Sequence, residues 1–142
     1  MTVPNAVAAL VSAQRLQVVP ADIVAARARL ARADQKLAAA RQIARIDIDV
    51  AYVTTYDATR IAVTAHMLSL GYRVRAVPRA HEAVGVYAEA TLNTPSASEF
   101  QRMRRRRNKA EYDDIIIGRL DLEADLAHAQ AIIDAVRKNL SP

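Results

Sequence analysis

A run of four consecutive arginines offers the clearest chemistry in this sequence of 142 residues. The run, Arg104–Arg107, lies within a helix-favouring segment from Phe100 to Tyr112. Successive positions of a helix are about 100° apart, so the four guanidinium groups project from all its sides and cannot all face solvent. A guanidinium group binds phosphate through paired hydrogen bonds and stabilises added negative charge. The run therefore predicts a site for a polyanion.

Within this run, the spacing of apolar residues singles out Arg107. Phe100, Met103 and Ala110 form an apolar stripe, and Arg107 falls on the same stripe. An arginine in that position is directed toward an interface or a cleft and needs an acidic or phosphate partner. Glu111, one helical turn later, is the nearest candidate. The alternative is a basic helix face neutralised internally by the acids Glu111, Asp113 and Asp114.

Two titratable side chains could add acid–base chemistry to the arginines. The helical spacing lets five residues share one polar surface: Arg104, Arg107, Asn108, Glu111 and Tyr112. For Tyr112, a structural hydrogen bond or a packing role is the simpler interpretation. His81 follows a basic loop and begins a predicted helix, so a capping or packing role is again the simpler one. The alternative places His81 beside Arg107 as a titrating group.

The other histidines and one acid–base pair have structural interpretations. His66 is expected to pack against the core or lie at its rim, and His128, which neighbours Asp125, is expected to be solvated. The histidines lack metal-ligand spacing with acids, so no metal site is predicted. Asp57 and Arg60 lie three residues apart and are expected to form a buried or interface pair that fixes helix packing. Alternatively, Arg60 joins the basic cleft and Asp57 orients it.

The net charge of +5 is concentrated in one part of the chain. Residues 71–109 contain nine Arg or Lys residues and three Glu residues, a net charge of +6, whereas the remainder has eleven basic and twelve acidic residues. Such a field attracts nucleic acid or an acidic partner protein. The sequence lacks a Gly-rich phosphate loop, a nucleophile elbow and interleaved aromatics, so RNA would bind mainly through its phosphates. The nucleic-acid-binding candidates are Arg104, Arg105, Arg106, Arg73, Arg75 and Arg79.

Helices must position these residues, and the composition favours helices over sheets. We predict an all-α fold, an antiparallel bundle of four to five helices, in a single domain over residues 1–142. Residues 1–19 form an N-terminal extension, with a weak helix over about 3–18, and residues 20–142 form the bundle. The helices of the bundle are expected over about 22–44, 47–70, 80–92, 96–112 and 120–140.

Local signals set these boundaries. Asp22 is a predicted N-cap, and Gly71 is a predicted C-terminal stop. The pairs Ser96–Glu99 and Ser98–Gln101 have the spacing of capping boxes, and residues 113–118 are expected to end or bend the arginine-rich helix. An apolar seam is interpreted first as core packing and second as a dimer contact; it consists of Ile23, Ala26, Leu30, Ala33, Leu37, Ala40 and Ala44.

Several function classes are disfavoured by composition. The chain has no cysteine, which excludes disulfides, cysteine-based zinc sites and cysteine nucleophiles and fits a cytoplasmic location. No apolar run is long enough for a membrane helix, and no signal-peptide pattern is present, so no membrane association is expected. No cofactor is predicted.

Several short motifs follow one another along the chain: residues 51–60, Gly71-Tyr72-Arg73, His81 at a helix start, and Arg107-Asn108-Lys-Ala-Glu-Tyr112. Their order resembles that of a HEPN domain. The resemblance covers about Ile46 to Leu140 and implies a bundle of four to five helices. Many members are RNases or toxins of toxin–antitoxin pairs, often beside a nucleotidyltransferase-type antitoxin. It also implies a homodimer whose two motif copies form one composite site.

The HEPN motif consists of an arginine, a polar residue and, four to six residues after the arginine, a histidine. Arg107 and Asn108 match the first two positions, whereas Tyr112 stands at the histidine position. RNA cleavage without metal needs a base and an acid, and a tyrosine with a pKa of about 10 is a poor base. We therefore predict RNA binding, with metal-independent endoribonuclease activity as one possibility. The alternatives are a non-catalytic module that binds nucleic acid or protein, and a purely structural helical protein.

Overall fold

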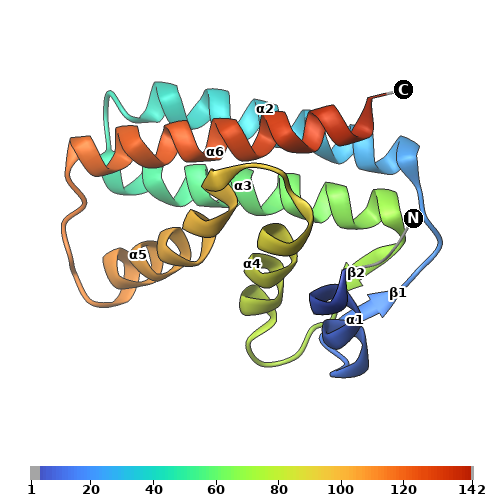
Figure 1. The fold of residues 1–142 in the computed structure, drawn as a ribbon. Coiled ribbons are helices and arrows are strands. Elements are labelled where there is room, and N and C mark those ends of the chain that lie inside the picture. Colours follow the sequence, from blue (N-terminus) through green and yellow to red (C-terminus); the bar gives the residue numbers. More distant parts are fainter. Residues whose placement is uncertain (1–3, 142) are drawn as a thin grey trace.

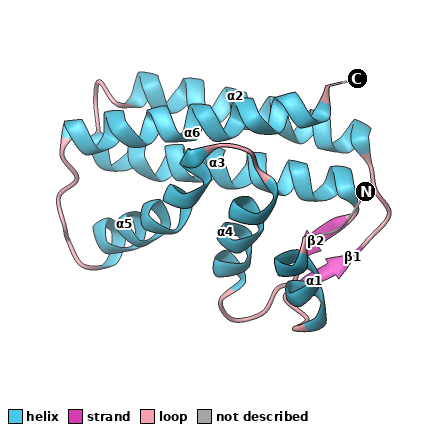
Figure 2. Ribbon diagram, viewed as in Figure 1, coloured by secondary structure: helices cyan, strands magenta, loops and turns pink. Residues whose placement is uncertain are grey.

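The computed structural model describes residues 4–141, which are almost entirely helical (Figures 1 and 2). The chain order is α1 (Asn5–Ser12), β1 (Leu16–Val18), α2 (Ile23–Ile43), α3 (Ile48–Leu70), β2 (Tyr72–Val74), α4 (Ala80–Thr91), the 3₁₀ helix η1 (Pro95–Glu99), α5 (Phe100–Tyr112) and α6 (Arg119–Leu140). Within these residues, no helix is long and apolar enough to cross a membrane. The predicted all-α class is confirmed.

The hairpin of α2 and α3 forms the centre of the fold, and its ends follow the local signals. The Asp22 side chain accepts a hydrogen bond from the backbone N–H of Ala25 at 2.9 Å, and Asp47 caps α3 through Val50 at 3.0 Å. Gly71 ends α3 in the left-handed region at φ +89°, which confirms the predicted stop. The predicted seam of α2 is buried except for Ile23, which favours its interpretation as core packing.

Helix α6 completes a layer of three long helices (Figure 1). Its predicted apolar stripe is buried as expected; the stripe consists of Leu122, Leu126, Ala129, Ile133, Val136 and Leu140. The Arg27 guanidinium donates to the Leu140 carbonyl at 3.0 Å, and Arg119 donates to the Ala44 carbonyl at 3.2 Å. These contacts join opposite ends of the two helices, so α6 is antiparallel to α2 and runs in the same direction as α3.

Helices α4 and α5 cover one side of α3, and η1 connects them (Figure 1). The predicted capping boxes of α5 are wrong: the Ser96 and Ser98 side chains do not cap the helix. Instead, Pro95 begins a 3₁₀ turn whose cap is Thr94, which accepts from the Ser96 backbone N–H at 3.4 Å. The Ser98 hydroxyl donates to the Pro95 carbonyl at 2.8 Å, so it satisfies the turn rather than α5.

The N-terminal segment is more ordered than a single weak helix. Helix α1 ends at Ser12, and β1 pairs antiparallel with β2, with Leu16 opposite Val74 (Figure 2). The predicted helix over 3–18 and the predicted loop over 71–80 are therefore each wrong in part, and residue 3 lies outside the described part of the chain. Val7 and Leu10 are buried, so this segment belongs to the same core as the bundle.

Candidate functional site

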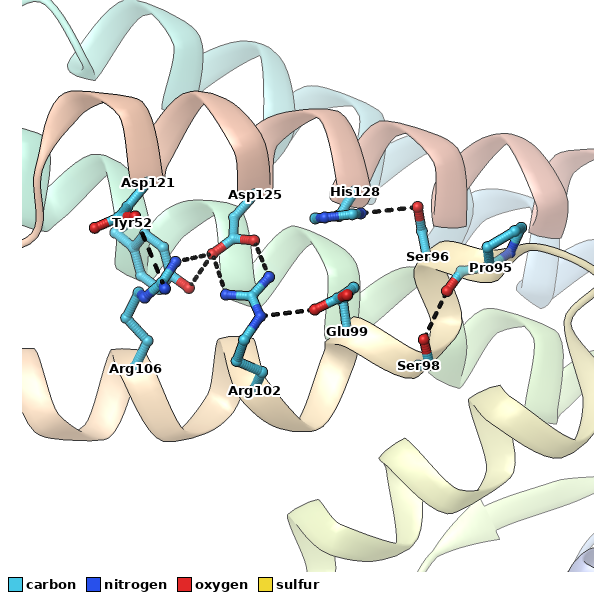
Figure 3. Close-up of polar contacts among 10 residues, drawn as sticks. All are labelled: Tyr52, Pro95, Ser96, Ser98, Glu99, Arg102, Arg106, Asp121, Asp125 and His128. Atoms are coloured by element: carbon cyan, nitrogen blue, oxygen red, sulfur yellow. Dashed lines mark hydrogen bonds and ion pairs between the residues drawn. The ribbon is translucent and has the colours of Figure 1, made fainter.

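A buried carboxylate on α6 holds the arginine-rich helix in place (Figure 3). Asp125 has no exposed surface. Arg102 binds it through two hydrogen bonds, from Nη2 to Oδ1 at 2.6 Å and from Nη1 to Oδ2 at 3.1 Å. Arg106 donates to Oδ2 at 2.9 Å, and the Tyr52 hydroxyl of α3 donates to the same oxygen at 2.6 Å. Three helices thus meet at one carboxylate.

The electrostatics of this cluster keep Asp125 ionised. Burial alone would raise the pKa of its carboxyl group, but the hydrogen bonds from Arg102 and Tyr52 and the positive charges of Arg102 and Arg106 outweigh burial and leave the pKa below its usual value. Arg102 also donates to Glu99 at 2.7 Å, which neutralises part of its charge. The cluster is therefore an internally balanced charge network.

This network changes the interpretation of two arginines. Arg106 was expected to bind nucleic acid, but it contacts Asp125 and lies 3.8 Å from Asp121, so its charge is already compensated. Arg102, which stands outside the run of four, makes the strongest contact of all. Asp125 gave a signal in the sequence, because it lies on the apolar stripe of α6, three residues after Leu122. A charge on such a stripe needs a buried partner.

Arg107 faces the other side of α5 and lies half-buried against α3. Its Nη1 contacts Glu111 at 3.0 Å and Asn108 at 3.2 Å, so the predicted partner Glu111 is confirmed and Asn108 is beside it. Its guanidinium carbon lies 5.9 Å from the centre of the Tyr56 ring, which is within reach of a cation–π contact. Within the described chain, Arg107 Nε and the Tyr56 hydroxyl are buried without a hydrogen-bond partner.

Three further residues surround Arg107 and Tyr56. Burial lowers the pKa of His81, and the positive charges of Arg60, Arg104 and Arg107 lower it further, so His81 of α4 lies within the field of this arginine group. Burial raises the pKa of the Tyr56 hydroxyl to about 12, although the same arginines oppose the shift. The structure thus brings His81 toward the arginines, as the second interpretation of His81 required, and leaves it exposed at the edge.

A close approach of α4 and α5 produces this juxtaposition. A Cβ atom on Gly85 would lie 2.4 Å from the Gln101 side chain, so any other residue here would displace that side chain. The Gln101 side chain donates to the Glu82 carbonyl at 2.9 Å. Arg104 lies 4.0 Å from the Glu82 carboxylate, which connects the start of α4 to the arginine helix.

Tyr112 does not join Arg107 within one subunit. Its side chain is 73% exposed at the end of α5, so it neither packs nor fills the position that a buried catalytic group would have. Of the expected polar surface, Arg107, Asn108 and Glu111 are in contact. Arg104 donates instead to Gln101, and Tyr112 is exposed at the end of the helix. Tyr112 is available to contact another molecule.

The remaining predicted residues are four arginines outside the Arg107 group and the expected pair of Asp57 and Arg60. Arg73 donates to Gln17 at 2.9 Å, Arg79 lies 3.5 Å from Glu82, and Arg75 and Arg105 are exposed. Asp57 and Arg60 are both half-buried, but no ion pair joins them in the described residues. The expected ion pair is thus not formed between these two residues. Arg60 lines a cavity with Arg29, Arg32 and Arg73, which is not the Arg107 cleft of the alternative interpretation.

The remaining histidines are both structural in this arrangement. His66 is buried, and its Nδ1 lies 2.8 Å from the Tyr87 hydroxyl, so the packing interpretation is confirmed. His128 is not simply solvated: it is half-buried and lies 2.9 Å from the Ser96 hydroxyl, because η1 covers that part of α6 (Figure 3). Among residues 4–141, no group of three potential ligands could hold a metal ion.

Comparison with protein-family models, with curated proteins and with solved structures gave no match to this chain. The chemistry of the site therefore has to be argued from its own geometry. That geometry offers guanidinium groups from α3 and α5, an exposed imidazole and an exposed phenol. Such a set can bind phosphate and exchange protons.

Proposed function

We propose that this protein is a HEPN-like RNA-binding protein with a basic site centred on Arg107. The observation that carries the proposal is the half-buried Arg107 with an unpartnered Nε, beside an unpartnered Tyr56 hydroxyl. Buried polar atoms without partners are rare and mark places where another group supplies the hydrogen bond. Both of these atoms are closed to solvent, so a phosphodiester would bind the partly exposed end of the Arg107 guanidinium group.

The same site supports a reaction as well as binding. In metal-independent RNA cleavage, a base removes the proton of the 2′-hydroxyl, whose oxygen attacks the adjacent phosphorus. The bond to the 5′-oxygen breaks, an acid protonates that oxygen, and the products are a 2′,3′-cyclic phosphate and a 5′-hydroxyl. His81 carries an imidazole, which can accept a proton near neutral pH, and arginines such as Arg107 and Arg104 stabilise the extra negative charge. We propose His81 as the base in such a reaction and Arg107 as the phosphate ligand.

A homodimer completes this proposal. Exposed apolar residues follow directly after Arg107 and Asn108, and they include Tyr112, Ile115, Ile116 and Leu120. Residues of this kind gathered at one end of a protein commonly form an interface. An interface there would bring the Tyr112 side chains and the two Arg107 groups toward each other. A nucleotidyltransferase-type antitoxin is a further partner that the resemblance suggests.

A cleavage assay with purified protein and RNA tests the enzymatic proposal. We expect cyclic-phosphate products from the wild-type protein, and at least a roughly hundredfold loss of rate in Arg107→Ala and in His81→Ala, as for a removed general base or electrostatic group. Arg41→Ala serves as the charge-matched control, because it removes an exposed arginine from α2, which does not contribute to the Arg107 site. Unchanged cleavage in Arg107→Ala would remove this residue from the mechanism.

The second candidate function, a non-catalytic binding module, is separated by the same proteins. It predicts salt-sensitive RNA binding that Arg107→Ala weakens, with no product at any pH. The position of Tyr112 favours this alternative, since its exposed side chain does not join the Arg107 group. A structural protein would bind no RNA even at low salt.

A further inference from the structure

A second arginine-lined feature lies between α2, α3 and β2. It is a cavity of about 330 Å³, which is within the size range of small-molecule sites. Four guanidinium groups line it: Arg29 and Arg32 from α2, Arg60 from α3 and Arg73 from β2. None of its lining residues is acidic. The cavity therefore concentrates positive charge from three elements.

The charges of these arginines are not compensated inside the described chain, where no ion pair involves any of the four. Three acids of α2, α3 and their caps have other partners, and Asp57 of α3 makes no ion pair with Arg60 in the described residues. Asp34 binds Arg137 at 2.6 Å, and Asp22 and Asp47 cap their helices. The positive charges around the cavity repel one another and raise the free energy of the empty site, and a bound anion relieves that repulsion.

The rest of the lining differs from that of a simple ion site. Ile61, Met67 and Val74 supply apolar surface, and Tyr72 adds an aromatic ring. The Tyr72 ring packs edge-on against Tyr87 with 6.3 Å between the ring centres, which fixes its orientation. A ligand that fits this lining has an anionic group for the arginines and a flat, partly apolar group for the opposite side.

We propose that this cavity binds a nucleotide, with its phosphate on Arg29, Arg32, Arg60 and Arg73 and its base against Tyr72 and Met67. Two sources share this chemistry, a free nucleoside phosphate and one nucleotide of an RNA strand. Arg60 also adds its field to Tyr56 and His81, so the cavity adjoins the Arg107 site. The inference goes beyond the proposed function, because its phosphate ligands lie outside α5.

Binding measurements with two probes separate the sources. The probes are each nucleoside 5′-monophosphate alone, followed by calorimetry, and a short fluorescein-labelled oligoribonucleotide, followed by anisotropy at low salt. The double variant Arg29→Ala/Arg32→Ala should weaken binding by about tenfold or more, since it removes two charge-assisted contacts, and should fold normally because neither residue makes an ion pair. Arg41→Ala, on the same helix, should bind like the wild-type protein.

Each outcome bears on the proposal. Monophosphate binding that the double variant loses supports a site for free nucleotides, whereas loss of oligonucleotide binding alone supports a strand site. Equal binding by the double variant and Arg41→Ala would overturn the proposal, as would equal competition by inorganic phosphate against the nucleotide. Arg107→Ala is measured in parallel, so a failure of the proposed RNA function would appear there and not in the cavity variants.

Discussion

At the scale of single residues, the five arginines of α5 divide by the partner that each one meets. Arg102 and Arg106 are bound by Asp125, whereas Arg107 meets Glu111 and Asn108 and keeps one nitrogen unpartnered in the described structure. Composition alone treats these residues as equivalent. Their burial and partners assign the first two to folding, and the third is the residue for which we propose a phosphate ligand.

Protonation of His66 should make the stability of the protein depend on pH. Burial lowers the pKa of His66 to about 4, and the unfolded chain has a value near 6.5. The unfolded state therefore binds the extra proton in this window, so the free energy of unfolding should fall as the pH drops from about 6.5 to about 4. The loss should be about 3 kcal/mol. Urea unfolding at a series of pH values measures it.

His66→Gln is the control for this prediction, because glutamine can still hydrogen-bond to Tyr87 but does not titrate. Carboxylates also titrate near the acid end of the window, so the informative quantity is the difference between the two proteins. The variant should show a flatter dependence on pH. Identical slopes for both proteins between about pH 6.5 and pH 4 would contradict the buried, neutral state of His66.

Which residues of the site could be predicted from sequence depends on how far apart their partners lie. Arg107 and Glu111 are one turn apart, and the helical period was sufficient to pair them. Arg102 and Asp125 are separated by a helix end and a connecting segment, so only the three-dimensional docking of α5 on α6 shows that they meet. His81 and Arg107 required the close approach at Gly85, which no local pattern encodes.

At the scale of elements, the docking of α5 should depend unequally on the two sides of its charge network. Arg102→Ala/Arg106→Ala leaves the fully buried Asp125 without a cation, which should cost about 3–5 kcal/mol of unfolding free energy. Asp125→Ala leaves arginines whose side chains are about a third exposed and can turn toward water. We expect a smaller loss of about 2 kcal/mol from Asp125→Ala, part of it from the Tyr52 hydroxyl.

Denaturant unfolding and hydrogen exchange measure these effects. Backbone amides of α5 should exchange faster in Asp125→Ala than in the wild-type protein, because the helix loses its contact with α6. Arg105→Ala, at an exposed position of the same helix, should change the unfolding free energy by less than about 0.5 kcal/mol. If Asp125→Ala loses more unfolding free energy than the double arginine variant, the unpaired buried carboxylate is not the larger cost.

The long helices could be predicted from local sequence patterns, whereas the two short strands could not. Helices α2, α3 and α6 follow from Asp22, Gly71 and a regular apolar stripe, since capping and periodicity are local. The strands β1 and β2 are only three residues long, and Leu16 pairs with Val74 across the whole α2–α3 hairpin. Such short strands carry too few positions for an alternating pattern, and their partner is remote in sequence.

At the scale of the whole molecule, one end of the bundle is unusually apolar on its surface. Ile116, in the segment that links α5 to α6, is 88% exposed, and Leu120, in the first turn of α6, is 81% exposed. Ile46, at the turn between α2 and α3, lines a cavity together with Ile116, so the two segments are neighbours. This surface lies next to the end of α5 that carries Asn108 and Tyr112. It is the face through which the proposed composite site would form.

A charge placed on this face should separate the proposed dimer. Ile116→Asp introduces an unpaired carboxylate into the proposed interface. Burying this charge costs more free energy than the apolar contact gains. Light scattering should therefore find the variant monomeric at concentrations where the wild-type protein is dimeric. Val24→Asp changes an exposed apolar residue of α2 and should leave the dimer intact. If the composite site is real, RNA cleavage and tight binding should fall with dimer formation in Ile116→Asp, although Arg107 and His81 remain. A wild-type monomer that cleaves RNA, or an Ile116→Asp monomer with full activity, would place the whole site within one subunit.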